Sequence, residues 1–453
     1  MIIYNRIPIA VSLFNPVVSF SVTYSHDQCR VQTGDDLMPV GHYPIRLLLI
    51  MTSVLLVFGC ASSFQPRPMD EVNLLERAQT QSKGQLRVTA AVLSAEETEA
   101  VFGVSLYKKG IQPVWLEIEN KEEEPTWFLP FSVDPDYFSP LEVTYPFHRP
   151  FNKTYNDQID QYFLNHAMGL FIAPGTTQSG FVFTNLKLGT KSFNVDLAGE
   201  DNQPKVFTFF ISVPGLKMDH QDVDFDNLYS ADEIISYDEA GFRKALESLP
   251  CCATNEDGTE QVGIINLVLV GSSEDLLRIL LRSGWNETAS GISPASSEKD
   301  ILGDIPAGYR YSSLNPKYYY GRAQDGAFRE LRATGTGRNV LWLWLSPMRV
   351  EGEPVWIGSV SRDLGPQRPS FKNHKVDLDE MRSFFIQNLW YTQGIKKYGY
   401  VKGTGASPIS RPKKIFGNIS YITDGYRAVL WVSDKSIPLN EVEAMNWEIP
   451  LAR

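Results

Sequence analysis

IINLVLVGSSEDLLRILLRSGW, at residues 264–285, is the stretch that decides the fold of the second half of the chain. The apolar run Gly263–Val270, which only Asn266 interrupts, is typical of a buried strand. Ser272 and Asp275 then form a capping box in front of leucines at helical spacing. A strand, a tight turn and a helix in this order predict a βα unit that packs on a sheet. The turn has no Walker lysine, so we do not expect nucleotide binding.

Similar patterns surround this unit. Ser236 and Glu239 form a capping box in front of another helical pattern, which Pro250 ends. Residues 377–393 are predicted to form an amphipathic helix. Three further stretches are apolar on both faces, as in central strands covered by helices: Val340–Leu345, Val355–Val360 and Arg427–Val432. Together these elements predict an α/β (α+β) sandwich domain over residues 236–435.

The first half of the chain shows a different period. Val114, Leu116 and Ile118 alternate with polar or interfacial residues, as expected of a strand with one buried face. Turn clusters separate further stretches of this kind, and the insertion 152–169 suits a short helix. The other predicted strands are Leu86–Leu93, Thr126–Leu129, Leu141–Thr144, Gly180–Phe183, Phe193–Leu197 and Lys205–Val213. Seven short strands predict an antiparallel β-sandwich, immunoglobulin-like in outline.

The predicted chain is therefore multidomain, a β-sandwich followed by an α/β (α+β) sandwich domain. A polar stretch after residue 60 is expected to act as a tether, with one helix at Met69–Thr80. The predicted divisions are an upstream extension and lipoprotein signal peptide at 1–59, a lipidated tether at 60–85, the β-sandwich at 86–213, an acidic linker at 214–235, the α/β domain at 236–435 and a C-terminal tail at 436–453.

Residues 46–60, RLLLIMTSVLLVFGC, indicate where the protein works. The run Leu47–Phe58 is too short to cross a bilayer, which takes about 20 residues, but it suits the apolar region of a signal peptide. Val57–Cys60 resembles the lipobox of bacterial lipoproteins, and that resemblance implies that Cys60 carries a diacylglycerol with fatty acids such as palmitate. We therefore expect a protein anchored in the bacterial cell envelope. Ala61 favours the outer membrane if the organism is Gram-negative.

The signal sequence lies far from Met1, because a signal peptide normally begins within a few residues of its basic region. A start at Met38 gives MPVGHYPIR as that region, so we favour Met38 over Met1. An ordinary secretory signal with an incidental cysteine is the alternative.

The charge of the chain limits its partners. The formal net charge is -11, and an acidic chain repels both phosphate backbones and anionic lipid surfaces. We therefore expect no nucleic-acid partner, and membrane attachment must rest on the acyl chains.

Metal and cofactor signals are weak. Cys251 and Cys252 have no second pair with which to form a zinc site, and they are either two half-buried thiols or a vicinal disulfide. Residues 222–233 resemble a calcium loop only in part, because Asn227 replaces the glycine of the sharp turn. We interpret this segment as an acidic linker and expect neither a metal nor a cofactor.

The tryptophans allow two interpretations. Seven of the nine lie after residue 235. A sugar-binding platform is one interpretation, but Trp342 and Trp344 alternate with leucines, which favours a buried core.

Several blocks of the second half, taken in order, resemble the LssY C-terminal domain over about residues 235–435. The blocks are LPCCATNEDG at 249–258, NLVLVGSSEDLLRILLRSGW at 266–285, GRAQD at 321–325, VWIGSVSRD at 355–363 and HKVDLDEMRSFF at 374–385. LYKKGIQPVWLEIEN at 106–120 and SGFVFTNL at 179–186 are similar to a module that precedes this domain in lipid-anchored bacterial proteins. The resemblance implies no defined reaction, although relatives include fusions to lipid-phosphatase-like membrane domains.

Two functions follow. The first, which we favour, is a lipid-anchored envelope protein that binds an envelope protein or a surface polymer such as a polysaccharide. The second is a hydrolase acting on phosphoesters or glycans, because an imidazole, carboxylates and guanidinium groups could serve as base, orienting groups and phosphate ligands. Its candidate catalytic residues are Arg322, Asp325, Arg362, Asp363 and His374, with Asp377 and Asp379 as further carboxylates.

Overall fold

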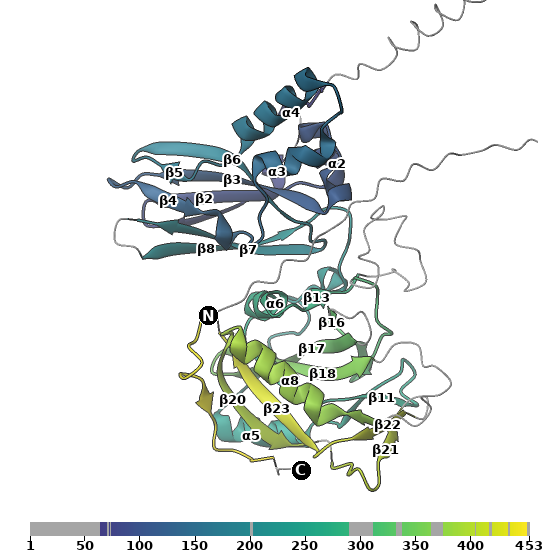
Figure 1. Cartoon of the computed structure of the whole chain (residues 1–453). Coiled ribbons are helices and arrows are strands. Elements are labelled where there is room, and N and C mark those ends of the chain that lie inside the picture. Colours follow the sequence, from purple (N-terminus) through teal and green to yellow (C-terminus); the bar gives the residue numbers. More distant parts are fainter. Residues whose placement is uncertain are drawn as a thin grey trace, which may run out of the picture. The chain divides into compact units, whose positions relative to one another are not determined.

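The computed structural model describes residues 64–69, 72, 74–199, 203–289, 311–331, 338–363, 375–403, 405–415, 419–433 and 435–450. These residues form several mainly antiparallel sheets with few helices, so the β-rich character expected from the sequence is confirmed (Figure 1). Within this part of the chain, no helix combines the length and the apolar composition needed to span a membrane.

Two four-stranded sheets build the N-terminal part. The first has the order β1 (Gln79–Lys83), β2 (Leu86–Val92), β3 (Ile111–Asn120) and β6 (Thr176–Asn185). The second has the order β5 (Phe171–Ile172), β4 (Thr126–Leu129), β7 (Thr190–Ala198) and β8 (Pro204–Ser212). One side of each sheet contributes to a shared core that includes Val88, Leu116 and Phe207. The alternating pattern therefore identified the buried faces correctly.

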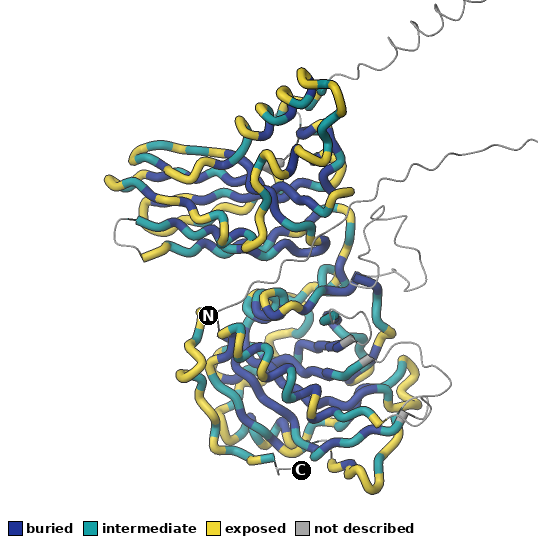
Figure 2. The backbone as a smooth tube through the Cα atoms, viewed as in Figure 1, coloured by how far each residue is buried: buried dark blue, intermediate teal, exposed yellow. Residues whose placement is uncertain are grey.

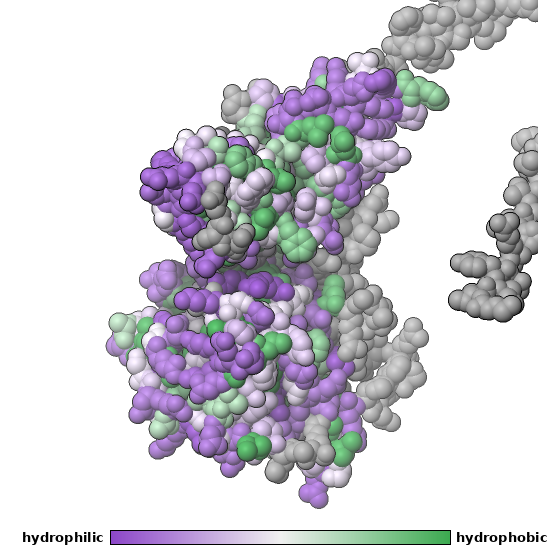
Figure 3. Space-filling model, turned by 60° about the vertical axis from the view of Figure 1, so that its left-hand side comes forward, coloured by the Kyte–Doolittle hydropathy of each residue, from purple (hydrophilic) through white to green (hydrophobic). Residues whose placement is uncertain are grey.

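Helices cover the other face of the first sheet. They are α2 (Ala95–Phe102), α3 (Pro140–Thr144) and α4 (Lys153–His166). Phe102 packs there against Phe181 and Phe183 of β6, and Phe163 packs against Phe183, with ring centroids 5.0 to 5.4 Å apart. The exposed face of α4 is largely hydrophilic, as Figure 3 shows.

Two predictions for this part are wrong. Leu141–Thr144 is not a strand but lies in α3, because Ser139 and Glu142 form a capping box in front of it. The helix expected at Met69–Thr80 is also absent from the described residues there, since a short 3-10 helix ends at Arg77 and β1 follows. The segment expected to be a tether thus adds an edge strand to the first sheet.

A nine-stranded sheet forms the centre of the C-terminal part. Its order is β13 (Asn286–Glu287), β16 (Gly326–Leu331), β17 (Arg338–Val350), β18 (Glu353–Asp363), β12 (Leu267–Val270), β23 (Tyr426–Val432), β20 (Ile395–Lys402) and β24 (Glu443–Ala444), and β9 (Ile235–Tyr237) pairs with β17. The stretches predicted to be central strands lie in β17, β18 and β23, each of which has a neighbour on both sides.

Helices lie on both faces of this sheet. Residues of α6 (Ser273–Arg282) and α8 (Leu378–Tyr391) share a core with one face, and residues of α5 (Glu239–Ser248) share a core with the other. Figure 2 shows the strands between them as mostly buried. The helices predicted from the capping box of Ser272 and from residues 377–393 are confirmed.

Two short sheets complete this part. One has the order β11 (Gln261–Ile264), β10 (Cys252–Thr254), β14 (Tyr318–Tyr319) and β15 (Arg322–Ala323). The other has the order β19 (Lys375–Asp377), β22 (Ile419–Ile422) and β21 (Lys413–Ile415).

The run Gly263–Val270 is therefore two strands in two sheets and not one. Asn266 marks the change, because its buried side chain donates to the carbonyl of Val360 and accepts from the amide of Val360. The tryptophans of the sheet belong to the core, since Trp342, Trp344 and Trp356 are all buried.

Candidate functional site

Arg322 and Asp325 are brought together at the end of a β-hairpin. Tyr320 and Gly321 both have positive φ, 52° and 73°, and form the turn between β14 and β15. Arg322 begins β15 and forms an ion pair with Asp325, which is buried. Burial raises the pKa of Asp325, although the adjacent guanidinium opposes this shift.

The same pair is tied to β17. Arg322 Nη2 donates to the carbonyl of Leu345 at 2.8 Å, and Asp325 Oδ2 accepts from the amide of Leu345 at 2.6 Å. The hydroxyl of Tyr229 donates to that carbonyl as well, at 2.8 Å. Both carboxylate oxygens of Asp325 are therefore engaged in holding the hairpin against the sheet.

Arg322 also lines a cavity of about 480 Å³, which we call the tyrosine pocket. Its aromatic wall is continuous, because Tyr320 contacts Tyr319 at 4.7 Å between ring centroids and Tyr319 contacts Trp344 at 5.8 Å. Tyr229, Tyr237 and Met348 line the rest of it. The pocket thus offers aromatic rings and the guanidinium of Arg322, whose side chain is 31% exposed. A group with an apolar face and a polar edge, such as a sugar ring, fits this combination.

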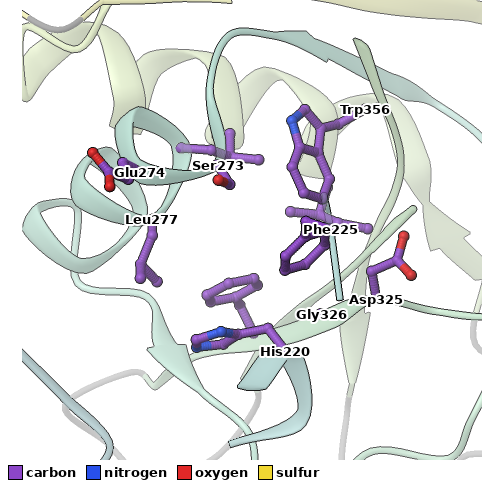
Figure 4. A pocket seen from close by; sticks show the side chains of 11 residues that line it. His220, Phe225, Ser273, Glu274, Leu277, Asp325, Gly326 and Trp356 are labelled. Carbon is purple, nitrogen blue, oxygen red and sulfur yellow. The ribbon is translucent and has the colours of Figure 1, made fainter. Parts of the chain in front are cut away.

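A second cavity, of about 260 Å³, lies next to Asp325 and is mostly apolar (Figure 4). Phe225 and Trp356 pack edge to face in its wall, with ring centroids 5.4 Å apart. His220 lies across the cavity from Ser273 in Figure 4, and its Nε2 is paired with Glu287. These polar groups come from separate elements, and among the described residues no hydrogen bond joins His220 to Ser273 or Asp325.

Arg362 lies elsewhere, in a cavity of about 140 Å³ that it shares with Lys317 and Tyr421. It forms an ion pair with Glu380 at 3.2 Å. Lys317 lies 3.3 Å from the centroid of the Trp342 ring, and burial lowers its pKa to about 7.

The hydrolase residues are therefore only partly assembled. Arg322 and Asp325 meet, whereas Arg362 lines a different cavity. His374 and the side chain of Asp363 lie outside the described residues. The two further carboxylates serve α8, because Asp377 caps it and Asp379 accepts from Thr423 and the amide of Asp424.

Cys251 and Cys252 form a disulfide directly after α5. Cys252 packs against Ile264, Leu378 and Tyr421, beside the cavity of Arg362. Across the described ranges, no cluster of three His, Cys, Asp or Glu side chains has the arrangement to hold a metal ion.

The tyrosine pocket was not predicted from the sequence. Its signal was the run YYYG at 318–321, where a tyrosine and a glycine in succession form a hairpin turn that exposes one ring. Tyr237 could not have been assigned to the same place, because it reaches the pocket through the parallel pairing of β9 with β17.

Residues 243–426 match the family described as LssY C-terminus. This confirms the resemblance seen in the sequence for that range, which includes Arg322, Asp325, Trp344 and most of the nine-stranded sheet. No curated protein matches the chain.

Proposed function

We propose that the protein is a bacterial lipoprotein, anchored through Cys60 in the cell envelope, that binds a surface polymer or an envelope partner. In this proposal the N-terminal sheets are an immunoglobulin-like sandwich and the C-terminal part is an α/β (α+β) sandwich domain. If the organism is Gram-negative, the outer membrane is the proposed location. The pattern of residues 46–60 supports the anchor, and the tyrosine pocket supports the binding.

The tyrosine pocket is the observation that carries the binding function. The exposed ring of Tyr320 can stack on the apolar face of a sugar ring, and Arg322 can bond its polar edge. Arg322 is held by Asp325 and Leu345, so its position changes little when a ligand arrives. We therefore propose a polysaccharide of the envelope as the ligand.

Binding is favoured over hydrolysis for a physical reason. Asp325 is buried and its two oxygens hold Arg322 and the amide of Leu345, so this carboxylate serves the hairpin, and Arg362 lines a different cavity.

Two matched tyrosine variants test the pocket. Tyr320→Asn removes a ring that is 73% exposed and keeps a residue type that tolerates positive φ, whereas Tyr391→Asn removes a ring that is 76% exposed outside the pocket. Loss of one stacked ring is expected to weaken retention on an envelope-polysaccharide resin about fivefold, since such a contact contributes about 1 kcal/mol. Tyr391→Asn should be retained like the wild type. Equal retention of all three proteins would contradict the pocket.

The anchor is tested separately. Cys60→Ala removes the sulfur that would carry the lipid. The variant protein should therefore move from the membrane fraction to the soluble fraction, and it should still be exported from the cytoplasm. Membrane association that persists in this variant would argue against a lipoprotein.

A further inference from the structure

The cavity lined by Arg362 has a charge that the chain as a whole does not lead one to expect. Two cationic side chains, Lys317 and Arg362, line it, and among the described residues of its wall there is no carboxylate. The chain has a net charge of -11, so two cations in one cavity of about 140 Å³ need an explanation. We call this cavity the Lys317–Arg362 pocket.

The pocket lies at the edge of β18, where β12 ends. β12 pairs with β18 only as far as Gly358, and the side chain of Asn266 then bonds the backbone of Val360. On the other side of Asn266 the chain belongs to β11, which is part of another sheet. Ser361 and Arg362 therefore pair with β17 alone, and the pocket lies between this end of β18 and β11, whose residues also line it.

Lys317 is buried without a hydrogen-bond acceptor for its ammonium. The residue is 9% exposed, its Nζ lies 3.3 Å from the centroid of the Trp342 ring, and no oxygen of the described residues accepts a hydrogen bond from this Nζ. Lys191 is also buried, but it donates to Thr184 and to the carbonyl of Asn185. An ammonium that lacks such acceptors is costly to bury, and burial lowers the pKa of Lys317 to about 7. Its N–H donors are available to a ligand, and a bound anion would raise this pKa again.

Gly263 of β11 provides the space for this lysine. A Cβ at position 263 would lie 2.7 Å from Nζ of Lys317 and 3.0 Å from its Cδ, which is too close unless the lysine moves. The backbone of β11 thus packs directly against the side chain of Lys317. Glycine at this position therefore sets where the ammonium lies in the wall of the pocket.

Arg362 is only partly engaged by the protein. Its Nη2 donates to Glu380 at 3.2 Å, and its Nε is buried without a partner. The side chain of Glu380 is 58% exposed, so water weakens this ion pair. Asp377, which lies between two residues of the wall, caps α8. Guanidinium donors therefore remain for a ligand.

Neutral donors are present in the same pocket. Ser359, Ser361 and Tyr421 line it, and their hydroxyl groups can add hydrogen bonds to those of the two cations. A phosphate group has several oxygens in a tetrahedral arrangement and up to two negative charges, so it matches donors that come from separate elements. Ser361 and Arg362 are partly exposed, so the pocket can be reached from the surface.

We propose that the Lys317–Arg362 pocket binds a phosphate group, either as free phosphate or as a phosphate monoester whose remainder stays outside. The volume of about 140 Å³ suits such a group and is too small for a chain of sugar rings. The pocket is therefore a second binding site, and it does not depend on the polymer proposed for the tyrosine pocket.

Equilibrium dialysis of the purified full chain against inorganic phosphate, at constant ionic strength, tests the site. One phosphate should bind per chain, and acetate at the same concentration should not displace it. Glycerol phosphate distinguishes the two sources: competition indicates a monoester, and no competition indicates free phosphate. Absence of bound phosphate, or displacement by acetate as strong as that by glycerol phosphate, would overturn the proposal.

Variants with matched charge changes assign the binding to the two cations. Lys317→Met should weaken phosphate binding at least about tenfold, because a charged donor is lost. Lys402→Met removes an exposed lysine, with 67% of its side chain accessible, and should bind like the wild type. If the two lysine variants weakened binding equally, phosphate would follow the overall charge and not the pocket.

Two further variants separate a binding role from a structural one. Glu380→Gln frees the guanidinium of Arg362 and should strengthen binding about threefold, an effect that misfolding cannot produce. Glu441→Gln makes the same charge change at an exposed site and should have no effect. Gly263→Ala keeps every charge but displaces the ammonium, so it should weaken binding. Equal binding by the Glu380 and Glu441 variants would remove Arg362 from the site and overturn the pocket.

Discussion

Arg427 shows how a buried charge can replace a helix cap. The residue is fully buried, and its guanidinium donates to the last carbonyl groups of α5, those of Leu246 and Leu249. These carbonyls carry the partial negative charge of the helix end, which a cation stabilises. Burial nevertheless lowers the pKa of Arg427. Its other acceptors are the carbonyl oxygens of Pro250, Ile265 and Gly403.

We therefore expect Arg427→Lys to lower the free energy of unfolding by about 3 kcal/mol. The carbonyl acceptors are spread around the planar guanidinium group, and a lysine ammonium cannot bond all of them. Urea unfolding followed by tryptophan fluorescence measures this. Arg411→Lys, at an exposed site, should change the same quantity by less than about 0.5 kcal/mol. Equal stability of the Arg427 variant and the wild type would show that the carbonyls are satisfied in another way.

Two buried lysines link stability to pH. Lys191 donates to the hydroxyl of Thr184 at 2.8 Å and to the carbonyl of Asn185 at 2.6 Å, and Lys317 lies over Trp342. Burial lowers the pKa of each from 10.5 to about 7. Between these two values the unfolded chain binds more protons than the folded chain. The free energy of unfolding therefore rises with pH across this window, and below about pH 7 both states are protonated and the effect is constant.

Lys317→Met should reduce this slope, which is at most about 1.4 kcal/mol per pH unit for each lysine. Urea unfolding at several pH values from about 6 to about 9 gives the comparison. Lys402→Met, which removes a lysine with 67% of its side chain exposed, should keep the slope of the wild type. A Lys317 variant with an unchanged slope would mean that this ammonium stays charged in the folded protein.

At the scale of elements, α5 begins where the sequence pattern did not place it. Ser236 was expected to cap the helix, but it lies in β9 and pairs with Arg349 of β17. The cap is Asp238, whose Oδ1 accepts from the amide of Gly241 at 2.7 Å. Serine and aspartate are both preferred at the residue that caps the N-terminus of a helix, so only the pairing of β9 with β17 decides between Ser236 and Asp238.

Asp238→Ala should therefore lower the free energy of unfolding by about 1 kcal/mol, because an amide of the first turn loses its acceptor. Ser236→Ala should have an effect below about 0.5 kcal/mol, since the side chain is exposed on a short edge strand. Chemical denaturation of both variants gives the answer. The reverse order of the two effects would place the helix start at Ser236.

Most elements could be predicted from local pattern, and each failure has an identifiable physical cause. The spacing of apolar residues shows directly which face of an element is buried. This spacing correctly predicted the strand with Val114, Leu116 and Ile118 and the helix after Ser272. Leu141–Thr144 is apolar enough for either structure, and the capping box of Ser139 decided for a helix. The strands on either side of Asn266 join different sheets, because its side chain bonds the backbone of β18, a partner far away in the sequence.

At the scale of the molecule, the tyrosine pocket could not be predicted in the same way. Tyr229, Tyr237, Tyr319 and Trp344 come from separate segments, and only the order of strands brings them to one place. Arg322 and Asp325 were both among the candidate residues named from the sequence, but nothing there predicted that they form a pair. Their role in tying the hairpin to Leu345 depends on the register of β16 with β17, which local pattern does not give.

The described residues also form separate large cores, and this has a consequence for how the protein unfolds. Phe163 belongs to the core beneath α4, and Phe385 belongs to the core beneath α6 and α8, and no residue is common to the two. Each sheet pairs strands from only one part of the chain. A smaller buried cluster, Tyr107, Leu188, Met218, Ala289 and Tyr311, contains residues of both parts. Because the large cores share no residue with each other, we nevertheless expect the two parts to unfold as separate units.

Phe163→Ala and Phe385→Ala test this, because each leaves a cavity that costs about 3 to 5 kcal/mol. Hydrogen exchange followed by mass spectrometry should show that Phe163→Ala speeds exchange in the strands of residues 79–212 and leaves β12 and β23 protected. Phe385→Ala should do the reverse. If either variant weakened protection in both parts equally, the two cores would form one cooperative unit.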